Sequence, residues 1–162
     1  MTPDNKKLFA GMVGIANTYK NSTELLEVVN DMVSRLAANQ GVKRPNSTDN
    51  LNFDEVVITR IVIYAINIEI LLKAIYLFDN DQTMRGHEWA ELYNHLSESR
   101  KQEIRNSMPE KFRSDFDELL NKNGDSFVRW RYCYEHDNMS CDLSFVNELS
   151  NTLGKIVLSL TD

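Results

Sequence analysis

Cysteine, proline and glycine are scarce in this chain, and each shortage narrows the possible folds. The 162 residues include 2 cysteines, 3 prolines and 6 glycines. Cys133 and Cys141 are too few for the disulfide framework of a small secreted protein, so we expect free thiols and a cytoplasmic setting. The polar start of the chain, Met1 to Lys7, predicts no signal peptide.

Excess positive charge and the common catalytic motifs are also missing. The net charge of −6 argues against a broad basic surface for nucleic acid, although a small basic cleft is compatible with it. The chain has no CxxC, HExxH, GxSxG or glycine-rich phosphate loop. Its histidines, His87, His95 and His136, do not have zinc-site spacing relative to the cysteines. We therefore expect no metal and no cofactor.

One apolar run, residues 56–78, is long enough to suggest a membrane span. It contains Arg60, Asn67, Glu69 and Lys73, and charged side chains at membrane depth are costly. This run is therefore predicted to be the central core helix of a domain that does not enter a membrane.

The spacing of apolar residues predicts an all-α chain, because no segment alternates as a strand does. A first helix is expected over Asn5–Tyr19, with Leu8, Met12, Ile15 and Tyr19 on its buried face. A cap at Ser22 or Thr23 would then start a second helix that stops near Gly41. The remaining predicted helices begin at Asn52 or Asp54, Gly86–Trp89, Ser97, Pro109, Asp125 or Ser126, and Leu143.

Two polar stripes are predicted on the long helix. Arg60, Tyr64 and Asn67 share one stripe, and Glu69, Lys73 and Tyr76 share the roughly opposite one. We expect one stripe to face solvent or a partner and the other to be tied to the fold. His87 is interpreted as a buried structural histidine that anchors its loop to Glu69 or Lys73, with catalysis as the alternative.

Arg131 and His136 are the candidate catalytic pair. Side chains five residues apart diverge by about 140° on a regular helix, so the pair can converge only if the helix ends near Asp137. Arginine can stabilise a phosphate, and histidine can move a proton near neutral pH. The alternative is an ordinary helix end, with Arg131 paired to Glu135 and His136 favoured by the helix dipole.

The order of these motifs resembles the HEPN superfamily of helical domains. The resemblance covers residues 51–162 and is carried by Glu69-x-x-x-Lys73, Gly86-His87 with Leu92 and Leu96, and Trp130-Arg131-Tyr132-x-Tyr134-Glu135-His136. It implies an up-and-down bundle with a long central helix and short additional helices. The chain would then be a single domain, 1–162, with an N-terminal helical pair (1–45) and a HEPN-like core (51–162).

The resemblance also implies a function and partners. Many members are homodimeric, metal-independent endoribonucleases of toxin–antitoxin or antiphage systems, and others are inactive partners or bind nucleotides beside a nucleotidyltransferase. In the active case His136 would act as general acid or base on RNA, Arg131 would stabilise the phosphorane, and Tyr132 and Tyr134 would stack on bases. An antitoxin or a nucleotidyltransferase is then a possible partner.

A noncatalytic module of the same fold is the alternative function. It would bind a partner protein, a nucleotide or its own copy, and Tyr132 and Tyr134 would pack in the core or an interface. The acidic net charge and the tyrosine that directly follows Arg131 favour this version.

Overall fold

The computed structural model describes the backbone of residues 1–39, 55–124 and 141–161, and the side chains of 1–28, 59–124 and 141–161. The protein is all-α, and no strand occurs in the described ranges. The helices are α1 (Pro3–Asn39), α2 (Glu55–Asn80), α3 (Trp89–Asn94), α4 (Glu98–Ser107), the 3₁₀ turn η1 (Glu110–Phe112), α5 (Phe116–Asn123) and α7 (Leu143–Ser159).

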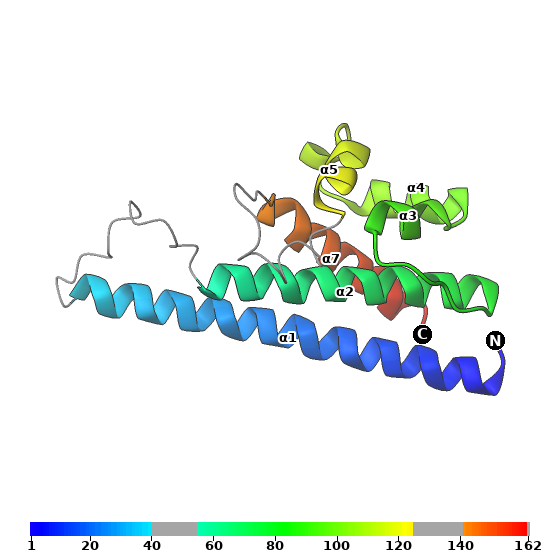
Figure 1. Cartoon of the computed structure of the whole chain (residues 1–162), viewed down its shortest axis with the longest axis horizontal. Coiled ribbons are helices and arrows are strands. Elements are labelled where there is room, and N and C mark those ends of the chain that lie inside the picture. The colour runs from blue at the N-terminus through cyan, green and yellow to red at the C-terminus, as the bar shows by residue number, and fades with distance from the viewer. Residues whose placement is uncertain (40–54, 125–140, 162) are drawn as a thin grey trace.

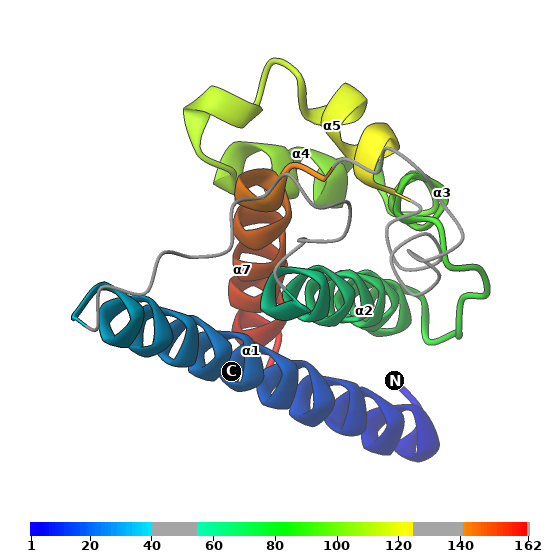
Figure 2. The same ribbon diagram turned by 60° about the vertical axis from the view of Figure 1, so that its left-hand side comes forward.

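The helices form layers around α2. Helix α1 lies antiparallel along one side of α2, and α7 crosses both of them at a steep angle (Figures 1 and 2). The short helices α3, α4 and α5 lie on the side of α2 away from α1 (Figure 1). The predicted long central helix is thus α2, which contacts α1, α3 and α7.

The predicted N-terminal pair of helices is wrong, because Pro3–Asn39 is one continuous helix. The expected break fell at Ser22 and Thr23, which often cap helices. Here the Ser22 hydroxyl donates to the carbonyl of Thr18 at 2.9 Å, and the Thr23 hydroxyl donates to that of Lys20 at 2.7 Å. A hydroxyl that bonds back to its own helix is tolerated in a helix interior, so these residues do not end α1.

The predicted buried face of α1 is only partly right. Phe9 and Ala16 are buried, whereas Leu8 and Ile15 have exposed fractions of 42% and 48%. Met12 is partly buried against the core. Helix α1 carries apolar residues on more than one side, so periodicity could not decide which side meets α2.

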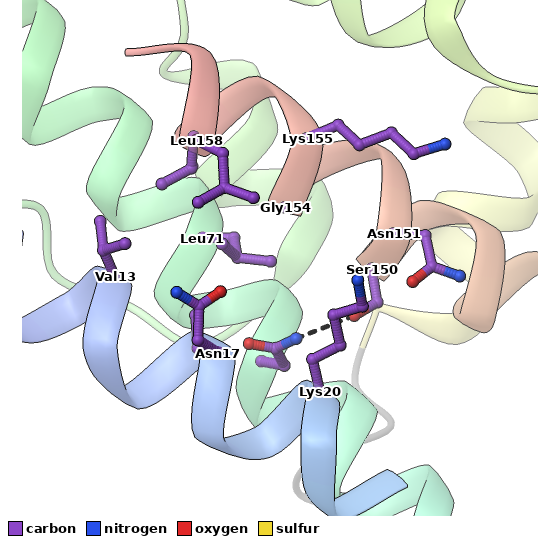
Figure 3. Close-up of a pocket in the computed structure, with 12 residues that line it drawn as sticks. Val13, Asn17, Lys20, Leu71, Ser150, Asn151, Gly154, Lys155 and Leu158 are labelled. Atoms are coloured by element: carbon purple, nitrogen blue, oxygen red, sulfur yellow. Dashed lines mark hydrogen bonds between the residues drawn. The ribbon is translucent and has the colours of Figure 1, made fainter. Parts of the chain in front are cut away.

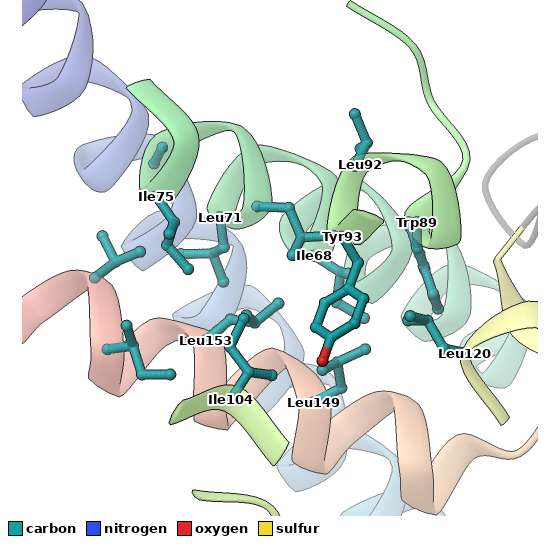
Figure 4. Close-up of a cluster of buried hydrophobic side chains, with 14 of the residues drawn as sticks. Ile68, Leu71, Ile75, Trp89, Leu92, Tyr93, Ile104, Leu120, Leu149 and Leu153 are labelled. Carbon is teal, nitrogen blue, oxygen red and sulfur yellow. The ribbon is translucent and has the colours of Figure 1, made fainter. Parts of the chain in front are cut away.

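Helix α2 provides the centre of the hydrophobic core. Its residues Ala65, Ile68, Ala74, Ile75 and Leu77 are fully buried. Figure 4 shows side chains of α2 meeting those of α3, α4, α5 and α7. Within the described residues, Thr59–Asn80 is also long and apolar enough to cross a membrane, a test that buried core helices pass as well.

Two predicted helix starts in the C-terminal half are confirmed. The Ser97 hydroxyl caps α4 by accepting from the backbone N–H of Arg100 at 3.3 Å. Helix α7 begins at Leu143, as predicted, and the Asp142 carboxylate caps it by accepting from the N–H of Phe145 at 3.0 Å.

The two long helices are clamped together where α2 ends. Asp81 has a φ of 53°, in the left-handed region that Asp tolerates better than most residues. Its carboxylate accepts from the backbone N–H of Thr2 at 2.9 and 3.0 Å and from the Asn5 amide at 2.7 Å. These hydrogen bonds hold the pKa of Asp81 below its ordinary value, the Asn5 amide contributing most.

Candidate functional site

The segment predicted to be catalytic lies between two described parts of the chain, which end at residue 124 and begin again at residue 141. Arg131 and His136 lie within residues 125–140, outside the described residues, as do Tyr132, Tyr134 and Glu135. Their predicted roles therefore remain predictions. The residues on either side, at the end of α5 and the start of α7, are described in detail.

Asn123 joins the two ends of this segment. It is fully buried, and its Oδ1 accepts from the backbone N–H of Asp142 at 3.0 Å. Its Nδ2 donates to the carbonyl of Leu119, one turn back in α5, at 2.8 Å. A buried amide with partners at both ends is fixed in orientation. The described residues on the two sides of 125–140 therefore lie next to each other.

The start of α3 is attached to the same place. The backbone N–H of Trp89 donates to the carbonyl of Gly124 at 3.2 Å, and the Trp89 side chain is fully buried. A Cβ on Gly124 would lie only 2.9 Å from the carbonyl oxygen of Leu120, so a larger residue would force the backbone to move. These contacts hold Gly124, the last described residue before 125–140, in a fixed position. The sequence did not predict them.

Of the four polar residues predicted to be structural, Glu69, Lys73 and His87 come together, and Glu135 lies outside the described residues. The Lys73 ammonium donates to Glu69 Oε1 at 2.8 Å, and His87 Nδ1 lies 3.0 Å from the same oxygen. The Glu69 side chain is only 12% exposed. His87 is not the buried residue that was predicted, because its side chain is 63% exposed. His87 meets Glu69 from the loop that ends α2, so the cluster ties that loop to the helix.

Gly86, which directly precedes His87, has an unusual backbone conformation. Gly86 has a φ of +101°, which side-chain-bearing residues rarely adopt. His87 precedes Trp89 by two residues, and two residues of extended chain span roughly 7 Å. The chain therefore runs within two residues from the contact of His87 with Glu69 to the contact of Trp89 with Gly124.

The other polar stripe of α2 faces α1 and α7. Tyr64 and Asn67 are buried, with exposed fractions of 4% and 3%. Arg60 forms an ion pair with Glu27 of α1, and Asn67 Nδ2 donates to the Ser150 hydroxyl of α7 at 2.9 Å. This stripe is thus tied to the fold.

A small cavity of about 50 Å³ lies where these three helices meet (Figure 3). Asn67 is among the residues that line it, and its buried Oδ1 has no hydrogen-bond partner among the described residues. A buried polar atom without a partner costs about 1–3 kcal/mol. This cavity could not be predicted from the sequence, because Asn67 and Ser150 are 83 residues apart.

The part of the chain that the structure describes has no candidate metal site, and the comparisons with known proteins found no relative. Among the described residues, no group of three or more His, Cys, Asp or Glu side chains could hold a metal ion. Comparisons with protein-family models, curated proteins and solved structures found no match.

Proposed function

We propose that this protein is a HEPN-like, metal-independent endoribonuclease that uses Arg131 and His136, in antiphage defence or toxin–antitoxin control. The sequence pattern around these residues suggests the activity. The observation that carries the proposal is Asn123, which holds the two ends of residues 125–140 side by side through its contact with Asp142. Catalytic residues are often positioned by a rigid frame, and Asn123 and its two hydrogen bonds provide one beside this segment.

The proposed reaction is transesterification within the RNA strand. The 2′-hydroxyl loses its proton to a base and attacks the adjacent phosphorus. The bond to the 5′-oxygen breaks, that oxygen gains a proton, and a 2′,3′-cyclic phosphate remains. His136 takes or supplies a proton, since its ordinary pKa is near neutrality. Arg131 neutralises charge on the phosphorane oxygens. In a homodimer, two such pairs would serve one composite cleft.

The test is RNA cleavage by the full chain in EDTA, with detection of the cyclic phosphate ends. His136→Ala is expected to lower the rate by about 10²–10⁴-fold, the usual contribution of an acid or base. Arg131→Ala is expected to lower it to a similar degree. The matched control is His95→Ala, because His95 is an exposed histidine at the end of α3. Wild-type protein that cleaves none of a varied set of single-stranded and structured RNAs would refute the proposal.

A noncatalytic interaction module is the second candidate, and α1 provides the observation that favours it. Leu25 and Val28 have exposed fractions of 64% and 56%, and Leu8 and Ile15 are also exposed. Apolar side chains gathered on one element often mark a binding surface. Sedimentation of the wild type and of the Leu25→Ser/Val28→Ser variant would test self-association through α1. Equal masses would count against a dimer formed by this surface.

A further inference from the structure

The outer side of α1 carries an uncharged stripe, which we call the α1 stripe. Its residues follow one another at alternating spacings of three and four: Leu8, Gly11, Ile15, Thr18, Ser22 and Leu25. This is the spacing of the seam along which two helices pack in a coiled coil. Leu8, Ile15 and Leu25 have exposed fractions of 42%, 48% and 64%. Figures 1 and 2 show α1 on the outside of the molecule, so a second helix can reach this side.

The polar residues of the α1 stripe can be covered at little cost. The Thr18 hydroxyl donates to the carbonyl of Gly14 at 3.0 Å, and the Ser22 hydroxyl donates to that of Thr18 at 2.9 Å. Because both donors are already used, a surface that covers them leaves no O–H unpaired. A Cβ placed on Gly11 would meet nothing within 4 Å. A second helix can therefore approach the backbone of α1 closely.

Charges of opposite sign lie near the two ends of the α1 stripe. Lys7 directly precedes its first residue, Glu24 directly precedes its last, and both are exposed. The ion pair of Glu24 with Lys20 is loose, at 3.8 Å, and exposed, so it contributes little. An antiparallel pair of stripes brings Lys7 of each copy within about one turn of Glu24 of the other. A parallel pair brings like charges together at each end, which disfavours it.

We propose that two copies of this chain associate by antiparallel packing of their α1 stripes. One register brings every residue of the stripe into contact with a residue of the other copy: Leu8 with Leu25, Gly11 with Ser22, and Ile15 with Thr18. The proposal rests on the interaction module that is the second candidate function, and it names the partner as a second copy. It does not involve Arg131 or His136.

The size of the α1 stripe sets the expected affinity. From residue 8 to residue 25 a helix rises about 26 Å, and a contact about one helix wide, roughly 10 Å, covers on the order of 250 Å² per copy. Contacts well below about 1,200 Å² in total belong to weak, transient complexes. We therefore expect a Kd of about 10–100 µM.

Sedimentation equilibrium of the full chain at low ionic strength measures this Kd. Ile15→Asp places a charge at the centre of the α1 stripe and should weaken association about tenfold or more. Ala10→Asp is the matched control, because it adds the same charge at an exposed residue outside the stripe, and it should leave the Kd unchanged. Wild-type protein that stays monomeric up to about 500 µM, or Ile15→Asp that associates as the wild type does, would overturn the proposal.

Charge reversal tests the antiparallel arrangement. Lys7→Glu should weaken association about fivefold, because both symmetric contacts with Glu24 change from attraction to repulsion. Lys7→Glu/Glu24→Lys exchanges the two charges and should restore the wild-type Kd. Lys6→Glu is the matched control, since Lys6 is also exposed but lies on another side of the helix.

These variants also separate the proposal from the interaction module on which it rests. In a parallel dimer each charge meets its own copy, so Lys7→Glu would leave the Kd unchanged. If Lys7→Glu had no effect while Leu25→Ser/Val28→Ser weakened association, the antiparallel arrangement would be overturned, and α1 would remain the surface of self-association.

Discussion

Helices α7 and α1 both pack against α2, but they are held there by different interactions. The buried face of α7 consists of Phe145, Val146, Leu149, Ser150, Thr152, Leu153, Ile156 and Val157. Among the described side chains of α1, only Phe9, Ala16 and Thr23 are buried. Helix α1 is also held by polar contacts, from Asp81 to its first turn and from Arg60 to Glu27.

Helix α7 is therefore part of the hydrophobic core, whereas α1 lies against the core and is held there partly by polar contacts. Apolar contacts do not titrate and are not screened by ions, whereas ion pairs and charged hydrogen bonds at the surface weaken with added salt and change with pH. Opening of a protein begins where few apolar contacts are lost. We therefore expect α1 to come away from α2 under conditions in which α2, α7 and the short helices remain folded.

The largest expected effect comes from Leu153→Ala in α7. Leu153 is fully buried, and truncation of a buried leucine costs about 2–5 kcal/mol of unfolding free energy. Chemical denaturation followed by circular dichroism measures this loss. Leu158→Ala is the control on the same helix, because Leu158 is 45% exposed, and it should stay within about 0.5 kcal/mol of the wild type.

Phe9→Ala provides the corresponding measurement on α1. Phe9 contacts Phe78 with ring centroids 5.5 Å apart. Its truncation should speed hydrogen exchange of the α1 amides and leave those of α7 unchanged. If Phe9→Ala instead lowered the protection of both helices as much as Leu153→Ala does, α1 would belong to the same cooperative unit as α7.

Asn123→Ala is expected to lower the free energy of unfolding by a smaller amount. It removes the hydrogen bond that joins the end of α5 to Asp142, at the start of α7. The substitution leaves the part-buried N–H of Asp142 without its partner, and the full penalty for an unpaired buried donor is about 1–3 kcal/mol. Asn121→Ala is a close control, since Asn121 also donates to a carbonyl one turn back, that of Asp117, but is exposed. In thermal unfolding, Asn123→Ala should have a lower melting temperature than the wild type, and Asn121→Ala should have nearly the same melting temperature as the wild type.

The same pair of variants bears on the proposed activity. Asn123→Ala should also lower the rate of RNA cleavage at temperatures where the variant is still folded. The reason is that the hydrogen bond that joins α5 to the start of α7, on the two sides of residues 125–140, is lost. Asn121→Ala should cleave as the wild type does. If folded Asn123→Ala cleaved RNA at the wild-type rate, the hydrogen bond between Asn123 and Asp142 would not be needed for the reaction.

The sequence predicted the fold class because long segments of helical periodicity leave few alternatives. It failed at Ser22 and Thr23, where a hydroxyl can either cap a new helix or bond back within an existing one, and the flanking sequence does not distinguish the two. The contact of His87 with Glu69 was among the predicted possibilities, but the exposure of His87 was not. Asn123 was missed because its role depends on Asp142, 19 residues away.

The smallest expected effect concerns the polar clamp of α1 and depends on pH. The pKa of Asp81 is lowered in the folded protein, chiefly by the Asn5 amide and next by the N–H of Thr2. A lowered pKa means that the carboxylate stabilises the fold above its unfolded pKa of about 3.9, and that this contribution is lost as the pH falls below that value. Below pH 4 the first turns of α1 should therefore exchange their amide hydrogens faster relative to α7.

Asp81→Asn shows whether this one carboxylate is responsible. Asparagine tolerates the positive φ at this position and keeps one acceptor, so the backbone turn is preserved. At neutral pH the variant should exchange the α1 amides faster than the wild type, and the difference should shrink as the pH falls and Asp81 becomes protonated. If the difference in exchange rate between the variant and the wild type persisted unchanged to pH 2, the charge of the Asp81 carboxylate would not be what holds α1. The backbone conformation of the turn at Asp81 and the packing around it would then be responsible.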